Sequence, residues 1–384
     1  MKKVIIPIIF ALAGTSFVTY SFLDTFIIAK KYDVSFEADG ASNFSFSFLE
    51  MEPATSSSSN NKTSNSHNNS SSKNNNSGQS NSSQNNSSQT TIDDKPQYYE
   101  DLTKEEIAAL FTKEVVFESK KHYSDPDIYI DITTGRFEDY TNYHAADIRI
   151  RSAGYLKTAL AKDTAGENYT EKTSEMCIRH KGILAINGDT YGSQNSGYVI
   201  RNGQIIRRTK NTRRRKAEDL AIYADGTFEV FNEKNYEIEE IAAKGAWQVF
   251  SFGPGLVANG QKIVQKGEEV GTAASQNRNQ RCAIGMISPL HYVFVVSDGR
   301  IKESPGLSLY QMGMIMEEKH CYCAYNLDGG GSATMFFDDG TGNANGKGEL
   351  VNYCTQELVN GPNLPEAPEI GEREVSDIVY IGKQ

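Results

Sequence analysis

An acid followed by three glycines and a serine is the part of this sequence best suited to chemistry. Asp328 ends an apolar run, and Gly329, Gly330, Gly331 and Ser332 form the turn that follows it. Successive glycines cost backbone entropy, so a chain that keeps them needs unusual dihedral angles or the close approach of another group. Main-chain N–H groups in such a turn can form a concave nest for an anion. The segment predicts an anion or sugar pocket beside a carboxylate, and a tight turn without a ligand is the alternative.

Two further strand ends carry an acid next to a glycine. Asn187, Gly188 and Asp189 follow one apolar run, and Asp298 follows another. Acids at the ends of strands can converge at one rim of a domain, where loops carry the chemistry on a rigid scaffold. Taken singly, each is also typical of an ordinary turn.

Arg281 and Arg300 flank the predicted strand pair that leads to Asp298. A guanidinium group binds phosphate through paired N–H donors. Both residues are therefore candidates for holding an anionic substrate, and the alternative is that they are surface arginines without a ligand.

Residues 326–332 resemble the signature of the phosphodiester glycosidase family. Other blocks of that family occur in the same order, at residues 185–189, 253–260, 281–285, 298–300 and 373–377. The resemblance spans roughly residues 140–384. It departs from the family pattern at two acids, because Asp189 stands where a second glycine is more usual and Asp377 stands where Asn is more usual.

The resemblance implies hydrolysis of a sugar 1-phosphodiester in a cell-surface glycan or glycolipid. Breaking the C1–O bond builds positive charge on the sugar ring and leaves a phosphomonoester, so carboxylates and phosphate ligands are both needed. The implied catalytic acids are Asp328, Asp298 and Asp189, with nucleophile and base not distinguished. The implied substrate and phosphate ligands are Asn187, Gly188, Arg281, Arg300, Gly329, Gly330, Gly331 and Ser332.

Two other functions stay open. One is a non-catalytic module that binds a polysaccharide or teichoic acid, and the other is a phosphodiesterase that cuts the P–O bond. We expect no cofactor, and a divalent cation such as calcium is the alternative because clustered Asp side chains can also bind calcium.

From residue 127 onward the apolar residues alternate as in strands. Asn202-Gly203 and Asp225-Gly226 each close a predicted hairpin, and Ser308 with Gln311 forms a capping box that opens a helix. The sequence therefore predicts an α+β domain with mixed, mostly antiparallel sheets and few helices.

The chain before this domain has a different character. Residues 4–23 carry no charge and are long enough to cross about 30 Å of hydrocarbon as a helix. Residues 56–88 are almost all Ser and Asn, which cannot form a core. We expect four parts: a cytoplasmic tip with a signal-anchor transmembrane helix (1–31), an extracytoplasmic linker (32–98), a helical lead-in (99–122) and the phosphodiester glycosidase-like domain (123–384).

Lys2 and Lys3 favour a cytoplasmic N-terminus, which makes this a single-pass protein of the cell membrane with an extracytoplasmic catalytic domain. A cleaved signal peptide is the alternative for the same segment.

The formal net charge of −10 argues against nucleic acid as a partner. One basic run is the local exception, formed by Arg207, Arg208, Lys210, Arg213, Arg214, Arg215 and Lys216. It is either a solvated loop or a contact for a polyanion such as wall teichoic acid or anionic lipid.

Overall fold

The computed structural model describes residues 29–32, 45–46, 96–138, 140–212, 217–267, 277–355 and 370–383. The predicted transmembrane helix and the Ser/Asn-rich tract lie outside these residues. Within the described ranges, no helix is both long and apolar enough to span a bilayer. The chain divides into two units, Met1–Glu50 with Tyr98–Gln384 and Met51–Gln97, and the domain below belongs to the first.

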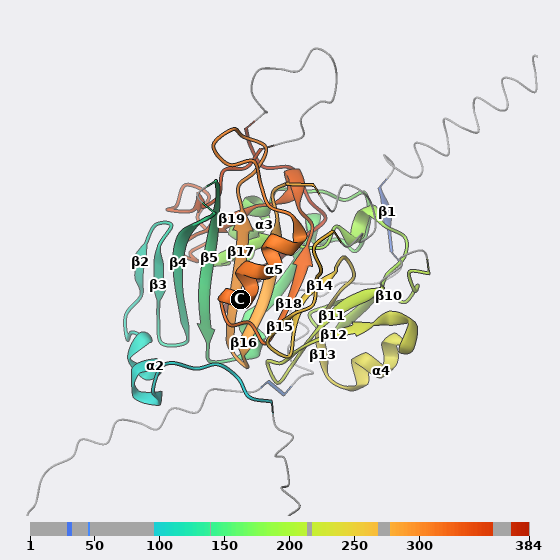
Figure 1. The fold of residues 1–384 in the computed structure, drawn as a ribbon, viewed down its shortest axis with the longest axis horizontal. Coiled ribbons are helices and arrows are strands. Elements are labelled where there is room, and N and C mark those ends of the chain that lie inside the picture. The colour runs from blue at the N-terminus through green and yellow to red at the C-terminus, as the bar shows by residue number, and fades with distance from the viewer. Residues whose placement is uncertain are drawn as a thin grey trace, which may run out of the picture. The chain divides into compact units, whose positions relative to one another are not determined.

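The largest sheet has nine strands in the order β15-β14-β18-β16-β17-β5-β4-β3-β2. Figure 1 shows β2 to β5 side by side. In that order their bounds are Gln261–Lys262, Gly255–Ala258, Cys323–Leu327, Cys282–Ser288, His291–Ser297, Thr141–Ile150, Ile128–Phe137, His122–Ser124 and Val116–Glu118.

Two five-stranded sheets complete the scaffold. The first has the order β20-β19-β8-β21-β6, with bounds Glu349–Leu350, Met335–Phe337, Leu184–Asn187, Asp377–Ile381 and Leu156–Leu160. The second has the order β10-β9-β13-β11-β12, with bounds Gln204–Arg207, Val199–Arg201, Ala246–Phe250, Glu218–Tyr223 and Phe228–Asn232. A short pair, β1 (Lys30–Lys31) and β7 (Gly166–Glu167), is also present.

Helices are few and short among the described residues. They are α2 (Lys104–Leu110), α3 (Thr173–Arg179), α4 (Ile238–Ala243) and α5 (Leu309–Glu318), together with single 3-10 turns. The predicted capping box of α5 is present, since Gln311 N donates to Ser308 Oγ and the Gln311 side chain accepts from Ser308 N. The prediction of mostly antiparallel sheets with few helices is confirmed, and all of the described strand pairs are antiparallel.

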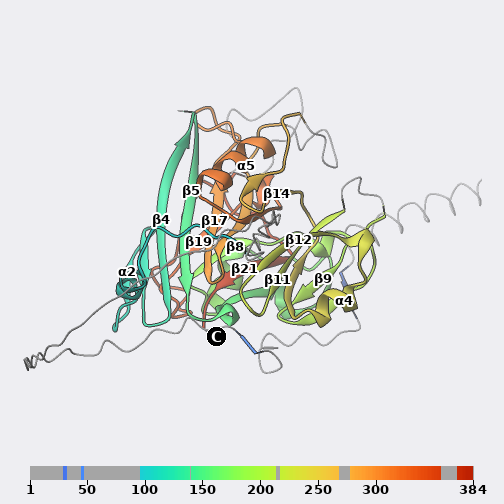
Figure 2. The same cartoon turned by 60° about the horizontal axis from the view of Figure 1, so that its bottom comes forward.

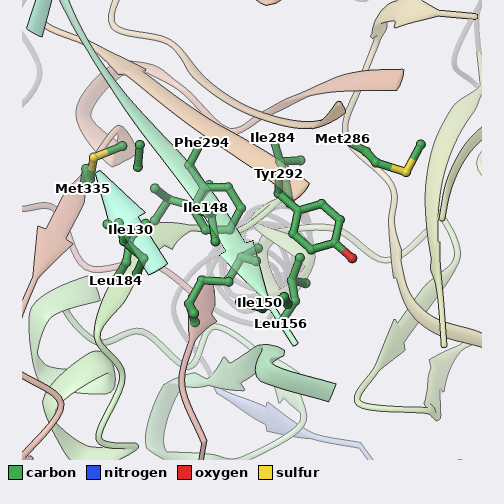
Figure 3. Packing of buried hydrophobic residues seen from close by; sticks show 14 of the residues in the cluster. Ile130, Ile148, Ile150, Leu156, Leu184, Ile284, Met286, Tyr292, Phe294 and Met335 are labelled. Atoms are coloured by element: carbon green, nitrogen blue, oxygen red, sulfur yellow. The ribbon is translucent and has the colours of Figure 1, made fainter. Parts of the chain in front are cut away.

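The main core is formed by residues of the nine-stranded sheet and of both five-stranded sheets. Alternate residues of β4 and β5, such as Ile130 and Ile148, point into this core because side chains alternate along a strand. Figure 3 shows them packed with Leu184 of β8 and Met335 of β19. A second apolar cluster packs α5 on the other face of the nine-stranded sheet, and Figure 2 shows α5 lying along that face.

The predicted lead-in differs from the observed one. Residues 99–122 are helical only over α2, whose capping box joins Thr103 and Glu106. Val116–Glu118 instead forms the edge strand β2, which pairs with β3. Valine and phenylalanine favour strands, because their side chains fit a pleated, half-buried surface, and this preference ends the helix early.

Candidate active site

Asn187 ties the ends of strands from two sheets together. It is the last residue of β8, and its Nδ2 donates to the main-chain oxygen of Asp328 over 2.8 Å. Its Oδ1 accepts from Thr334 N over 3.2 Å. Asp328 N in turn donates to Gly188 O over 3.2 Å. The Asn187 amide therefore holds both ends of the glycine turn, where β8 and β18 meet.

The glycine turn is closed by hydrogen bonds from its main-chain N–H groups. Gly329 N donates to Asp328 Oδ1 over 2.9 Å, Gly330 N donates to Gln280 O over 3.0 Å, and Ser332 N donates to Gly329 O over 3.2 Å. A Cβ atom on Gly329 would lie 2.6 Å from Gln280 O, so only glycine fits there. These three N–H groups have acceptors within the protein, and the anion nest expected from the sequence stays a prediction. Side chains around the turn are further candidate donors for an anion.

Arg300 is one of those side chains. Its Nε donates to Asn279 Oδ1 over 2.9 Å. Gly330 has a left-handed φ of +60°, and a Cβ atom on it would lie 2.9 Å from Arg300 Nη2. The glycine thus leaves room for the guanidinium group, which lies directly against the turn.

Arg281, the other predicted phosphate ligand, is more enclosed. It is 7% exposed, and its Nε and Nη2 donate to Leu307 O and Asn277 O over 2.9 and 2.7 Å. Burial lowers the pKa of its guanidinium to about 10, against the opposing effect of the Asp328 charge. Two of its donors therefore hold the main chain around β16.

Asp328 is the acid placed closest to the turn. Its side chain is 14% exposed, with Oδ2 lying 3.4 Å from Arg373 Nη2. Burial raises the pKa of the Asp328 carboxyl, and the negative charge of Asp189 acts in the same direction. The Ser332 hydroxyl, the Arg373 guanidinium and Gly329 N–H oppose this rise without cancelling it. A carboxyl with a raised pKa is suited to transferring a proton near neutral pH.

Arg373 is a site residue to which the sequence analysis gave no role. Its Nε donates to Ser332 Oγ over 3.1 Å, and its Nη2 donates to the same hydroxyl and to Asp328 Oδ2. Its side chain is 39% exposed, so it has access to solvent as well as to the turn. Its position at the start of the block 373–377 was the only signal in the sequence.

A buried charge cluster lies behind the turn. Arg201 Nη2 lies 2.6 Å from Asp189 Oδ1 and 2.8 Å from Asp377 Oδ2, and all three side chains are buried. Asp189 Oδ2 also accepts from Ser251 N over 2.8 Å. Asp189 and Asp377 are the two acids at which the sequence departs from the family pattern. Both bind the Arg201 guanidinium, so the two departures have one structural reason.

Gly188 is required by this cluster. A Cβ atom on it would lie 2.3 Å from Asp377 Oδ2, so a larger residue would push the carboxylate away from Arg201. The sequence analysis did not find Arg201, which it placed only in a hairpin. Its partners lie far from it along the chain, and local patterns do not carry such pairings.

Asp298 lies in a different hydrogen-bond network from Asp328 and Asp189. Its Oδ1 accepts from Tyr353 N over 2.8 Å and lies 3.4 Å from His144 Nε2. Its Oδ2 accepts from Asn142 Nδ2 over 3.4 Å. The structure therefore brings Asp328 and Asp189 into mutual electrostatic contact and gives Asp298 a separate set of partners.

Part of the basic run is also described. Arg207 is 7% exposed, and its Nε and Nη1 donate to Gly197 O and Tyr191 O, so these donors serve the main chain. Contact of the basic run with a polyanion stays a prediction. Arg208 and Lys210 pair with Glu239 and Glu237. Residues 213–216 lie outside the described ranges.

Comparison with known proteins identifies a family and a shared fold. The sequence model of the family described as phosphodiester glycosidase matches residues 180–381. The SPbeta prophage-derived uncharacterized protein YomE of Bacillus subtilis (strain 168) is 29% identical over 171 residues, which is 44% of this chain and 26% of that protein. The chain therefore matches only about a quarter of the length of this relative.

A solved structure shares the fold. It is the catalytic domain of zebrafish N-acetylglucosamine-1-phosphodiester alpha-N-acetylglucosaminidase, auto-inhibited by its pro-peptide. The TM-score is 0.51 and the identity 20%, over 71% of this chain and 88% of the zebrafish chain.

The buried cluster predicts a characteristic dependence of stability on pH. Burial raises the pKa of Asp377 from 3.8 to about 7. The folded protein thus holds this proton more tightly than the unfolded chain, so the free energy of unfolding should fall as the pH rises from about 4 to about 7. Asp377→Asn keeps a hydrogen-bond acceptor for Arg201 but does not titrate. Urea unfolding measured across this range gives the free energy of unfolding at each pH. Between pH 4 and 7 this free energy should fall by at least about 1 kcal/mol more in wild type than in Asp377→Asn.

Asp101→Asn, at an exposed acid, is the matched control. Its free energy of unfolding should change with pH as that of wild type does. Equal slopes in wild type and Asp377→Asn would show that Asp377 is ionised throughout this range.

Proposed function

The chain belongs to the phosphodiester glycosidase family, and we propose that it is a membrane-anchored, extracytoplasmic hydrolase of a sugar 1-phosphodiester in a cell-surface glycan or glycolipid. The reaction breaks the bond between the anomeric carbon and the phosphate oxygen. A phosphate leaves readily, so the protein must mainly bind the phosphate, stabilise positive charge on the sugar and deliver a nucleophile.

The observation that carries this proposal is the environment of Asp328. Its carboxyl is mostly buried, is held at Oδ1 by Gly329 N, and has a pKa raised by burial. Rigid placement of a carboxylate next to the anomeric carbon supplies much of the advantage of an enclosed site. Asp328 either attacks the anomeric carbon itself or takes a proton from the water that does.

The phosphate would be held in front of this acid by Arg373. This guanidinium is half-exposed and already lies against Ser332 Oγ and Asp328 Oδ2. A phosphate oxygen is a stronger partner for a guanidinium than a hydroxyl is, because the hydrogen bond is charge-assisted on both sides. Binding would therefore draw Arg373 toward the substrate and release Asp328 for chemistry. Arg300, on the other side of Gly330, is the second candidate ligand.

Asp189 supports the site indirectly in this proposal. It is fully buried, and its two oxygens are occupied by Arg201 Nη2 and Ser251 N. An acid so placed cannot reach a sugar ring, but its charge raises the pKa of Asp328. Asp298, with its partners Tyr353 and His144, is the remaining candidate for a second carboxylate.

The membrane anchor is part of the proposal and rests on the sequence of residues 4–23. An uncharged stretch of this length followed by a tract rich in Ser and Asn suits a hydrolase tethered in a cell envelope.

The direct test of the catalytic assignment is Asp328→Asn. This variant keeps the shape and the acceptor for Gly329 N but removes the charge. With a nitrophenyl glycosyl phosphodiester as substrate, kcat should fall by about 10²-fold or more, as expected for loss of a base or nucleophile. Substrate binding, followed by calorimetry, should be largely kept.

Thermal unfolding serves as the control, because a folded Asp328→Asn protein with near-normal kcat would transfer the catalytic role to Asp298. If the wild type binds the nitrophenyl glycosyl phosphodiester but does not turn it over, the non-catalytic binding module is favoured instead.

Arg373→Ala tests the phosphate ligand. Removing a charge-assisted donor should lower kcat/KM for the phosphodiester by about 10- to 100-fold, equivalent to roughly 1.5–3 kcal/mol. Arg208→Ala, at an exposed arginine paired with Glu239, is the matched control and should leave kcat/KM unchanged. Retention of activity in Arg373→Ala together with its loss in Arg300→Ala would place the phosphate on the other side of the glycine turn.

A further inference from the structure

A cavity of about 360 Å³ opens on the face of the nine-stranded sheet that points away from the main core. It is lined by β4, β5 and β17, by the end of α5 and by the chain before α2. β4 contributes Tyr129, Asp131 and Thr133, alternate residues that share one face, whereas Ile130 between them points into the core.

This cavity is separate from the candidate active site. His291 lines it at the first residue of β17, and Asp298 follows the last residue of the same strand. Seven strand residues at about 3.3 Å each put roughly 20 Å between the two ends. A ligand in the cavity would therefore not touch Asp328 or the glycine turn.

The charges around the cavity are predominantly negative. Asp131 and Asp147 are directly opposite each other on β4 and β5, and their side chains are 44% and 49% exposed. Like charges in this position are destabilising. Each has one histidine neighbour, His122 and His291 respectively. Two further acids and one lysine complete the charged lining: Asp101, Glu318 and Lys319.

His291 provides a second, independent indication of a ligand. It is 6% exposed, and its Nε2 lies 3.1 Å from Asp147 Oδ1. Its Nδ1 is buried without a hydrogen-bond partner among the described residues, and Glu100 Oε2 is 3.9 Å away. A buried ring nitrogen without a hydrogen-bond partner carries a desolvation cost, which a polar group of a ligand can offset.

Aromatic rings lie at the same cavity. Tyr99 is 42% exposed and stacks on His320, with ring centroids 3.7 Å apart. Tyr129 is half-buried on the sheet. Aromatic faces attract cations through their quadrupole.

The size and spacing of the lining favour an organic cation over a metal ion. Among the residues that the structure describes, no group of three or more His, Cys, Asp or Glu side chains is placed to hold a metal. Ala145, Ile287 and Val293 add apolar surface to the lining, which suits a carbon skeleton.

We propose that this cavity binds a protonated amine carried on a ring or a short carbon skeleton, with Asp131 and Asp147 as its counter-charges and Tyr99 as its aromatic wall. The site is independent of turnover at Asp328. An amino sugar of the cell envelope is a ligand of this chemistry, and the positive charge is what the site recognises.

The test is calorimetric titration of the purified full-length chain with glucosamine, at mildly acidic pH where its amine is protonated. N-acetylglucosamine has the same ring without the charge and is the matched ligand. We expect saturable binding of glucosamine that is about tenfold or more tighter than that of N-acetylglucosamine. Asp131→Asn combined with Asp147→Asn should weaken glucosamine binding to a similar extent, and Glu105→Gln on α2 should not change it.

Equal affinity for the two sugars, or no saturable binding of either, would overturn the proposal. Displacement of glucosamine by calcium chloride at a clearly lower ionic strength than sodium chloride requires would indicate a metal site and would also overturn it. If the double variant does not fold, Tyr99→Leu replaces it, because this exposed ring can be removed without touching the sheet. Unchanged glucosamine affinity in Tyr99→Leu would then contradict the site.

Discussion

The guanidinium group of Arg201 is the interaction on which the rest of the candidate site depends. Arg201 ends β9 of one five-stranded sheet, whereas Asp189 follows β8 and Asp377 begins β21 of the other. Its Nη1 also donates to Ile200 O and Val249 O. A planar fork of five donors can serve two carboxylates and the main chain at once, which a lysine ammonium cannot do. Loss of one partner from such a buried pair typically costs about 3–5 kcal/mol.

The cluster of Arg201, Asp189 and Asp377 influences where Asp328 lies. Gly188 packs on the Asp377 carboxylate, so β8 can approach only with glycine at that position. Asn187, one residue earlier, then reaches Asp328 O and Thr334 N and closes the glycine turn. The same cluster acts electrostatically, because the Asp189 charge adds to the burial that raises the pKa of Asp328. The cluster thus helps to place the proposed catalytic carboxyl and adds a smaller effect to the rise that burial causes in its pKa.

Local features of the sequence predicted local features of the structure. The hairpins closed by Asn202-Gly203 and Asp225-Gly226 are present as β9–β10 and β11–β12, with both glycines and Asn202 at positive φ. The capping box at Ser308 opens α5 as predicted. These signals depend on neighbours within a few residues, where the geometry of turns and caps decides the outcome.

What the sequence did not reveal depends on pairings across the fold. Arg201 meets Asp377 over 176 positions, and Arg373 meets Asp328 over 45. The partner of the Gly330 N–H is of the same kind, since Gln280 O comes from another loop. Motifs and the family resemblance pointed to Asp328, Asp189 and Arg300, but only the packed sheets decide which residues are their partners.

The most direct test of the account is to run the reaction in ¹⁸O-labelled water with a nitrophenyl glycosyl phosphodiester and to locate the label by mass spectrometry. If the site delivers water or Asp328 to the anomeric carbon, the label appears at O1 of the released sugar, and the nitrophenyl phosphate contains none. Label in the nitrophenyl phosphate would show that the P–O bond is cut and would contradict the assignment of this chain as a glycosidase.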